Sequence, residues 1–256
     1  MSTDVSNAAN GSQPQAPAMP LFYRQIAVID TVRHAAIKLS RDAGYGFAAK
    51  TNAILLCNGE FHAAAQTYPI VFSSGVDALP LVICGFSDDR NLFVTGEGSW
   101  RPNAYIPAYV RRYPFIFVQN PDSNELLLGV EEDSDRIGTT QGTPLFDDGK
   151  PSDALREALT FCTNYQDQVV RTQEFGAALH AAGVLEEQQA QINFPRGGTA
   201  QMGGFRVISP AKFDALDDAT FLDWRRRGWL PLVFAHFHSM GQWQSLIEIL
   251  SGKAAS

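Results

Sequence analysis

The sequence predicts an α+β fold: a single globular domain whose mostly antiparallel, strand-rich N-terminal half packs against C-terminal helices. Short apolar runs separated by turn residues dominate from Leu21 to about Val130. From Ser152 onward, apolar residues recur instead at helical spacing. Strands first and helices afterwards favour α+β over an alternating array of parallel βαβ units.

Residues 1–20 are predicted to be a disordered tail, followed by one folded domain at residues 21–252. The tail is rich in Ser, Asn, Gln, Ala and Pro and has few large apolar side chains. Such a segment buries too little surface to offset the entropy lost on ordering. The 256-residue chain is 45% hydrophobic and 18% charged, a balance typical of a globular protein.

The elements of the first half follow from apolar runs and turn residues. A buried strand is expected at Ala53–Cys57, helical turns at Glu60–Thr67 and another strand at Ile70–Ser73. Two hairpins are expected, each across a turn-rich segment. They join 79–86 to 91–94 across SDDR, and 115–119 to 126–130 across NPDSN.

The second half is predicted to be mainly helical. Ser152 caps a long helix that Gly183 ends. A hairpin then joins 191–194 to 202–208 across an RGGT turn. Three further helices are expected: one opened by Ser209-Pro210, one at 219–227 capped by Asp218, and a last one at 232–250.

Composition narrows the function classes. The formal net charge of −7 argues against nucleic-acid binding, which needs a basic surface. The chain lacks an apolar run of the roughly 20 residues that span a membrane, and its start lacks the pattern of a secretory signal. Cys57, Cys84 and Cys162 are too few and too scattered for a disulfide framework. We therefore expect a cytoplasmic protein without a membrane span.

The segment WRPNAYIPAYVRRYPF, residues 100–115, supplies the candidate ligand-binding residues. A guanidinium binds carboxylates or phosphates through two hydrogen bonds and stacks on aromatic rings. On a helix spanning 103–112, Tyr105 and Tyr109 would share a face with Arg112. The predicted ligand-binding set is Arg111, Arg112, Trp100, Tyr105 and Tyr109, for a small anionic or sugar-like ligand or a partner protein. In the alternative interpretation the arginines are structural and pair with the acidic run 131–135.

The remaining motifs favour structural roles. The segment 44–51, GYGFAAKT, lacks the last glycine of a phosphate-binding loop and precedes a strand. His236 and His238 lie about 200° apart around a helix, so they cannot hold one metal ion together. The acidic run Glu131–Asp135 lacks EF-hand spacing and is more typical of a solvated turn. We therefore expect no cofactor and no metal site, and no motif with catalytic spacing argues for an enzyme.

Several blocks together resemble the SapC-like proteins of bacteria. They are GFAAKT, EFHAAAQTYPIVF, GFSDDRNLFV, the arginine-rich segment above, GTPLFDDGKPS, GGFRVIS, KFDAL and RRGWLPLVFAHFHSMGQWQSLI. The resemblance runs from about Phe22 to Leu250. It implies an association with surface-layer systems and with genes for TonB-dependent receptors, and it implies no settled catalytic residues.

Three functions therefore compete. The leading hypothesis is a non-enzymatic ligand- or partner-binding accessory of nutrient-uptake or surface-associated systems. The first alternative is a metal-assisted enzyme that uses the acidic run, one histidine and an arginine on an anionic or sugar-like substrate. The second is a structural protein of the surface layer.

Overall fold

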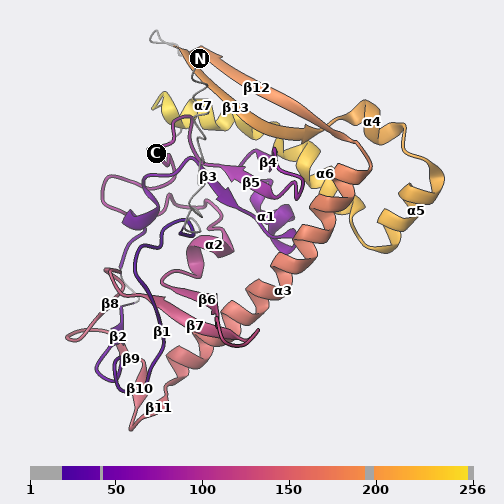
Figure 1. The fold of residues 1–256 in the computed structure, drawn as a ribbon. Helices are drawn as coiled ribbons and strands as arrows, with labels where there is room; N and C mark the ends of the chain where they lie inside the picture. Colours follow the sequence, from indigo (N-terminus) through magenta and orange to yellow (C-terminus); the bar gives the residue numbers. More distant parts are fainter. Residues whose placement is uncertain (1–18, 41–42, 194–198, 253–256) are drawn as a thin grey trace, which may run out of the picture.

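A five-stranded antiparallel sheet and a 29-residue helix organise the molecule (Figure 1). The computed structural model describes residues 19–40, 43–193 and 199–252, so most of the predicted tail lies outside the described residues. The sheet has the order β12-β13-β4-β5-β3. Its strands are β3 (Ala53–Leu55), β4 (Ile70–Ser73), β5 (Pro80–Ile83), β12 (Leu185–Asn193) and β13 (Thr199–Ile208).

Three smaller sheets lie toward the N-terminal end of the long helix α3 (Asp153–Ala181), away from the five-stranded sheet (Figure 1). Their orders are β1-β7-β6, β8-β2-β9 and β10-β11. The strands are β1 (Ile26–Val28), β2 (Lys38–Leu39), β6 (Phe115–Gln119), β7 (Leu126–Glu131), β8 (Ile137–Gly138), β9 (Thr143–Pro144), β10 (Phe146–Asp147) and β11 (Lys150–Pro151). The hairpin of β6 and β7 confirms the pairing predicted across NPDSN.

The long helix α3 (Asp153–Ala181) connects the two regions. Ser152 caps it as predicted, because its hydroxyl accepts a hydrogen bond from the Leu155 amide at 3.3 Å. Leu155 and Cys162 pack into a small core cluster with Phe115, Val130, Leu145 and Phe146. Phe175 packs instead with the larger cluster around the five-stranded sheet. One amphipathic helix therefore contributes to both cores.

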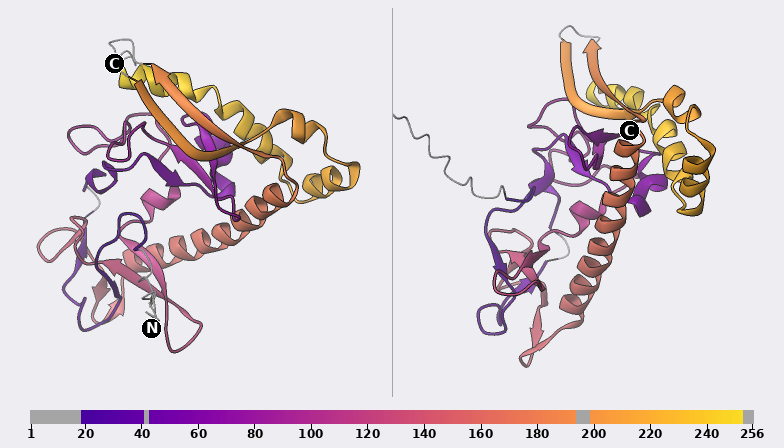
Figure 2. Two further views of the ribbon diagram at one scale, coloured as in Figure 1. Left: turned by 45° about the horizontal axis from the view of Figure 1, so that its top comes forward. Right: turned by 45° about the vertical axis from the view of Figure 1, so that its right-hand side comes forward.

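Of the four C-terminal helices, α6 and α7 lie against the five-stranded sheet, and α4 and α5 project beyond it (Figure 1). The four helices are α4 (Pro210–Asp214), α5 (Asp218–Arg226), α6 (Leu230–Ser239) and α7 (Gln242–Leu250). Figure 2 shows α6 and α7 lying alongside the β12–β13 hairpin. Trp243 on α7 stacks on Phe205 of β13, with the ring centroids 5.8 Å apart. Strands and helices therefore segregate as the α+β prediction requires, within a single domain.

Two predicted elements differ in the structure. Residues 91–94 were expected to pair with 79–86, but β3 and β4 occupy both edges of β5. The following chain keeps one hydrogen bond, from the Leu92 amide to the Cys84 carbonyl, and Val94 then bridges to Trp100. The last helix is also shorter than predicted, because the chain breaks between α6 and α7 at Met240 and Gly241.

Helix caps and turns account for smaller differences. Asp217, one residue before the predicted cap, accepts the hydrogen bond from the Thr220 amide at 2.9 Å, and Asp218 is the first helical residue. The helical turns expected at 60–67 form as η2 (Asn58–Glu60) and α1 (Phe61–Ala64). The hairpin of β12 and β13 is longer than expected, and residues 194–198 between them lie outside the described residues. None of the described helices is long and apolar enough to cross a membrane.

Candidate functional site

The arginine-rich segment forms one helical turn, α2 (Ala108–Arg111), instead of the predicted helix over 103–112. Asn103 has φ of 61°, and Pro107 is extended with ψ of 144°, so neither residue continues a helix toward the N-terminus. Tyr105 therefore lies outside the helix and does not share a face with Arg112. The two arginines consequently have different surroundings.

Arg112 is buried among tyrosine rings. Its side chain is 9% exposed. The guanidinium carbon lies 4.4 Å from the ring centroid of Tyr109, 4.6 Å from that of Tyr165 and 5.6 Å from that of Tyr23. Cation–π attraction is strongest where water is excluded, so this cage compensates part of the cost of burying the charge. This arrangement favours a structural role for Arg112, with aromatic rings in place of the acidic run.

Arg111 is exposed and is held in one orientation. Its Nε donates to the Ile106 carbonyl at 3.0 Å, and one terminal nitrogen donates to the Tyr105 hydroxyl at 3.2 Å. The guanidinium carbon also lies 5.4 Å from the ring centroid of Phe161 on α3. Two of its five donors are used by the protein, and the others remain available to a ligand.

Glu60 is a buried anchor of this segment that sequence reasoning missed. Its Oε1 accepts hydrogen bonds from the Ala108 amide at 2.6 Å and from the Tyr105 hydroxyl at 2.9 Å. Its Oε2 accepts from the Cys57 amide at 2.9 Å. Burial, with the neighbouring Glu60 carboxylate, raises the pKa of Tyr105 to about 12, so its hydroxyl remains protonated. The spacing from residue 57 to Glu60 matches a capping box, and this pattern in the sequence could have indicated that Glu60 binds a backbone amide.

The acidic run is used elsewhere. Glu131 is buried, and its carboxylate accepts from the backbone amides of Arg24 at 2.7 Å and Gln25 at 2.9 Å. Glu132 forms an ion pair with Arg33 at 2.5 Å, and its other carboxylate oxygen lies 3.3 Å from Nε2 of His34. These contacts hold the end of β7 against residues 24–34, the segment that contains β1. Within the described residues, none of them reaches Arg111 or Arg112.

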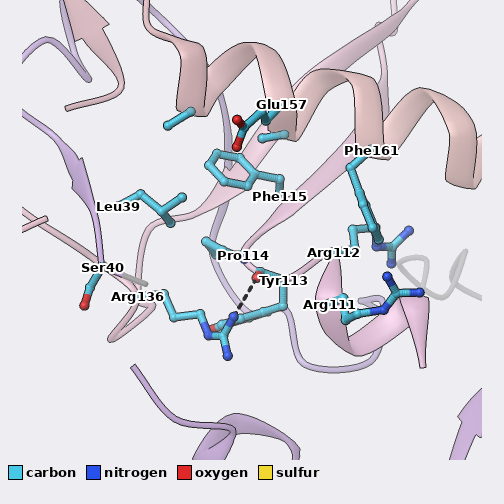
Figure 3. A pocket seen from close by; sticks show the side chains of 12 residues that line it. Leu39, Ser40, Arg111, Arg112, Tyr113, Pro114, Phe115, Arg136, Glu157 and Phe161 are labelled. Atoms are coloured by element: carbon cyan, nitrogen blue, oxygen red, sulfur yellow. Dashed lines mark hydrogen bonds between the residues drawn. The ribbon is translucent and has the colours of Figure 1, made fainter. Parts of the chain in front are cut away.

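A pocket of about 280 Å³ brings the two arginines together with a third, Arg136 (Figure 3). Arg136 precedes β8 and was not predicted from the sequence. The pocket lies between the start of α3, the end of α2 and β2. Its other lining residues are mainly apolar, with Glu157 the one carboxylate among them: Leu39, Ser40, Tyr113, Pro114, Phe115, Ala154, Glu157, Ala158 and Phe161. Its volume suits a small organic molecule.

Arg136 is held by carbonyls and aromatic rings. One terminal nitrogen donates to the Gly44 carbonyl at 2.9 Å, and the other lies 3.5 Å from the Tyr113 carbonyl. Its guanidinium carbon lies 4.8 Å from the ring centroid of Tyr45 and 5.1 Å from that of Phe47. The Nε atoms of Arg112 and Arg136 are buried without a hydrogen-bond partner in the described structure.

The other predicted site residues lie outside this pocket. Trp100 is buried in the core, where its indole N–H donates to the Tyr68 hydroxyl at 3.2 Å. Tyr105 contacts Arg111 and Tyr109 contacts Arg112, but neither tyrosine is among the residues that line the pocket. The structure therefore brings Arg111 and Arg112 into one pocket and places Tyr105 and Tyr109 against them, whereas Trp100 packs in the core against Tyr68 and Tyr45.

The remaining motifs have structural surroundings. Gly44–Thr51 forms the 3₁₀ turn η1 (Gly46–Ala48) and leads into strand β3, so it lacks the helix N-terminus of a phosphate-binding loop. His236 is buried and His238 is exposed, as expected for positions two apart on a helix. Across the residues that the structure describes, no group of three or more His, Cys, Asp or Glu side chains is placed to hold a metal ion.

Comparison with known proteins identifies a family. The sequence model of the SapC family matches residues 29–246, which is most of the chain. No curated protein and no solved structure matches it. The chain therefore belongs to the SapC family, as the resemblance of its sequence blocks indicated.

Proposed function

We propose that this member of the SapC family is a non-enzymatic binding protein for a small organic anion, and that the pocket of Arg111, Arg112 and Arg136 is its binding site. One observation carries the proposal. Three arginine residues and one carboxylate residue, Glu157, line one pocket, and among the ion pairs of the described residues none joins one of these arginines to a carboxylate. The chain as a whole carries a formal charge of −7, so this pocket is a local concentration of positive charge.

Electrostatics makes this arrangement favourable for an anion. Bringing three positive charges to one pocket that has a single carboxylate residue, Glu157, raises the free energy of the unliganded protein. A carboxylate or phosphate in the pocket would add negative charge beside the arginines and would accept hydrogen bonds from the unused N–H donors of Arg111. The apolar wall, which includes Phe115 and Phe161, would contact the carbon skeleton of the ligand.

A pair of matched variants tests the proposal. We expect isothermal titration calorimetry to detect binding of small carboxylates or phosphorylated compounds, and Arg111→Gln to weaken it by about tenfold or more, the value of one charge-assisted interaction. Arg225→Gln removes the same charge from an exposed position of α5 and should leave the affinity unchanged. Equal affinities for both variants would refute the site, and an absence of binding to any anion of the panel would refute the function.

The biological setting is part of the proposal. We place the protein in the cytoplasm, as an accessory of nutrient-uptake or surface-associated systems, on the strength of the family resemblance. Cell fractionation tests the location, and recovery in the surface layer would favour the structural alternative instead. In the metal-assisted enzyme, a metal ion at the acidic run would displace the backbone amides that Glu131 binds or the Arg33 guanidinium that Glu132 binds. No observation favours that alternative specifically.

A further inference from the structure

Arginine residues lie at opposite ends of the pocket, and this arrangement suggests the class of ligand. In Figure 3, Arg136 lies at one end, Arg111 and Arg112 lie at the other beside Phe161, and Tyr113 and Pro114 lie between them. The chain from Arg112 to Phe115 forms this intervening wall, and Pro114 has no amide hydrogen to offer a ligand. The pocket therefore has arginine residues at two ends, with Tyr113, Pro114 and Phe115 between them and the Glu157 side chain above Phe115 on the α3 side (Figure 3).

From this arrangement we propose that the ligand is an organic dianion whose two acidic groups are separated by an apolar spacer, such as an aliphatic dicarboxylate. The inference rests on the proposed function, because it assigns a ligand class to the same pocket. One acidic group would bind the unused donors of Arg111, and the other would bind Arg136. The spacer would lie along Pro114 and Phe115.

The protein contacts of the two arginines support two separate binding ends. Arg111 is fixed by the Ile106 carbonyl and the Tyr105 hydroxyl, and Arg136 by the Gly44 carbonyl. Neither guanidinium has to be ordered by the ligand, so little side-chain entropy is lost on binding. A monoanion can neutralise only one end and leaves the other uncompensated. A dianion of suitable length compensates both.

The test compares paired ligands by calorimetry on the full chain. The probes are dicarboxylates from malonate to adipate and the monocarboxylates of the same carbon number. We expect the best dicarboxylate to bind at least about tenfold more tightly than its monocarboxylate partner, since a second charge-assisted contact is worth that much or more. Affinities that are equal within twofold for every pair overturn the dianion inference and leave the anion-binding function standing. If neither class binds and the phosphorylated compounds do not bind either, the proposed function itself fails.

Variants of Arg136 assign the second end. Arg136→Gln should reduce the dicarboxylate affinity about tenfold and change the monocarboxylate affinity by less than about twofold. Arg136→Lys keeps the charge but not the two-pronged geometry, so its dicarboxylate affinity should lie between those of the native protein and Arg136→Gln. Because Arg136 also donates to Gly44, thermal unfolding is measured for each variant. If Arg136→Gln is unfolded, the paired-ligand comparison on the native protein and on Arg136→Lys decides the inference. An equal loss for both ligand classes in a folded variant overturns it.

Discussion

His236 makes the stability of the protein depend on pH in a predictable way. The imidazole is fully buried on α6. Its Nδ1–H donates to the Ile70 carbonyl of β4 at 2.9 Å, and its Nε2 accepts from the Ile208 amide of β13 at 3.1 Å. Only the neutral ring can make both hydrogen bonds, because a protonated Nε2 cannot accept. Burial lowers the pKa of His236 to about 4.

The magnitude follows from the difference between the two pKa values. The unfolded chain has the ordinary histidine value of about 6.5, so it binds a proton that the folded protein does not bind between the two values. The stabilisation is therefore complete above about pH 6.5 and is lost as the pH falls toward about 4. Each pH unit in this window is worth about 1.4 kcal/mol, so the free energy of unfolding should fall by about 3 kcal/mol across it from His236 alone.

Urea unfolding from neutral to acidic pH measures this effect. His236→Gln should be less stable than the native protein near pH 7, because two buried hydrogen bonds are disrupted. Its stability should then fall less steeply on acidification, so that the two curves converge. His238→Gln, two residues away on the exposed side of α6, should follow the native curve. Parallel pH curves for His236→Gln and the native protein would refute the reasoning.

Three further predictions concern packing. Arg112→Ala should lower the free energy of unfolding by at least about 2 kcal/mol, because it empties the tyrosine cage. Arg111→Ala, at the exposed neighbouring position, should lower it by less than about 0.5 kcal/mol. Equal effects of the two variants in urea unfolding would contradict a structural role specific to Arg112. Gly176→Ala in α3 should lower the melting temperature although alanine favours helix, since its Cβ would lie 2.2 Å from the Asp77 carbonyl oxygen; an unchanged or higher value would disprove this. Burial raises the pKa of Cys57 to about 12 and that of Cys162 to about 11, so both thiols should react slowly with Ellman's reagent until urea unfolds the chain, and rapid reaction of the native protein would contradict their burial.

Local chemistry made much of the fold predictable. The Ser152 cap and the glycine at 183, which has φ of 67°, mark the two ends of α3 in the sequence. The apolar run Ile70–Ser73 coincides with strand β4. The false hairpin at 79–94 shows the limit of such signals. Turn residues indicate where the chain reverses, but they do not reveal that β3 and β4 already occupy both edges of β5.

The candidate site was only partly predictable, because tertiary contacts determine it. The sequence identified Arg111 and Arg112 from their unusual aromatic surroundings, but it extended their helix through Asn103, where the backbone is left-handed. It gave no sign that Arg136 would join them, since that residue is stacked on Tyr45 and Phe47 from a distant segment. The tyrosine cage likewise combines Tyr23, Tyr109 and Tyr165, which only the folded chain brings together.

A crystal structure of the protein grown with its tightest-binding dicarboxylate would show directly whether the arginine pocket binds the ligand. We expect ligand density in the pocket beside Phe161, with one carboxylate on Arg111 and the other on Arg136. An empty pocket at a ligand concentration that saturates binding in calorimetry, or the ligand bound on another face of the molecule, would contradict the proposal.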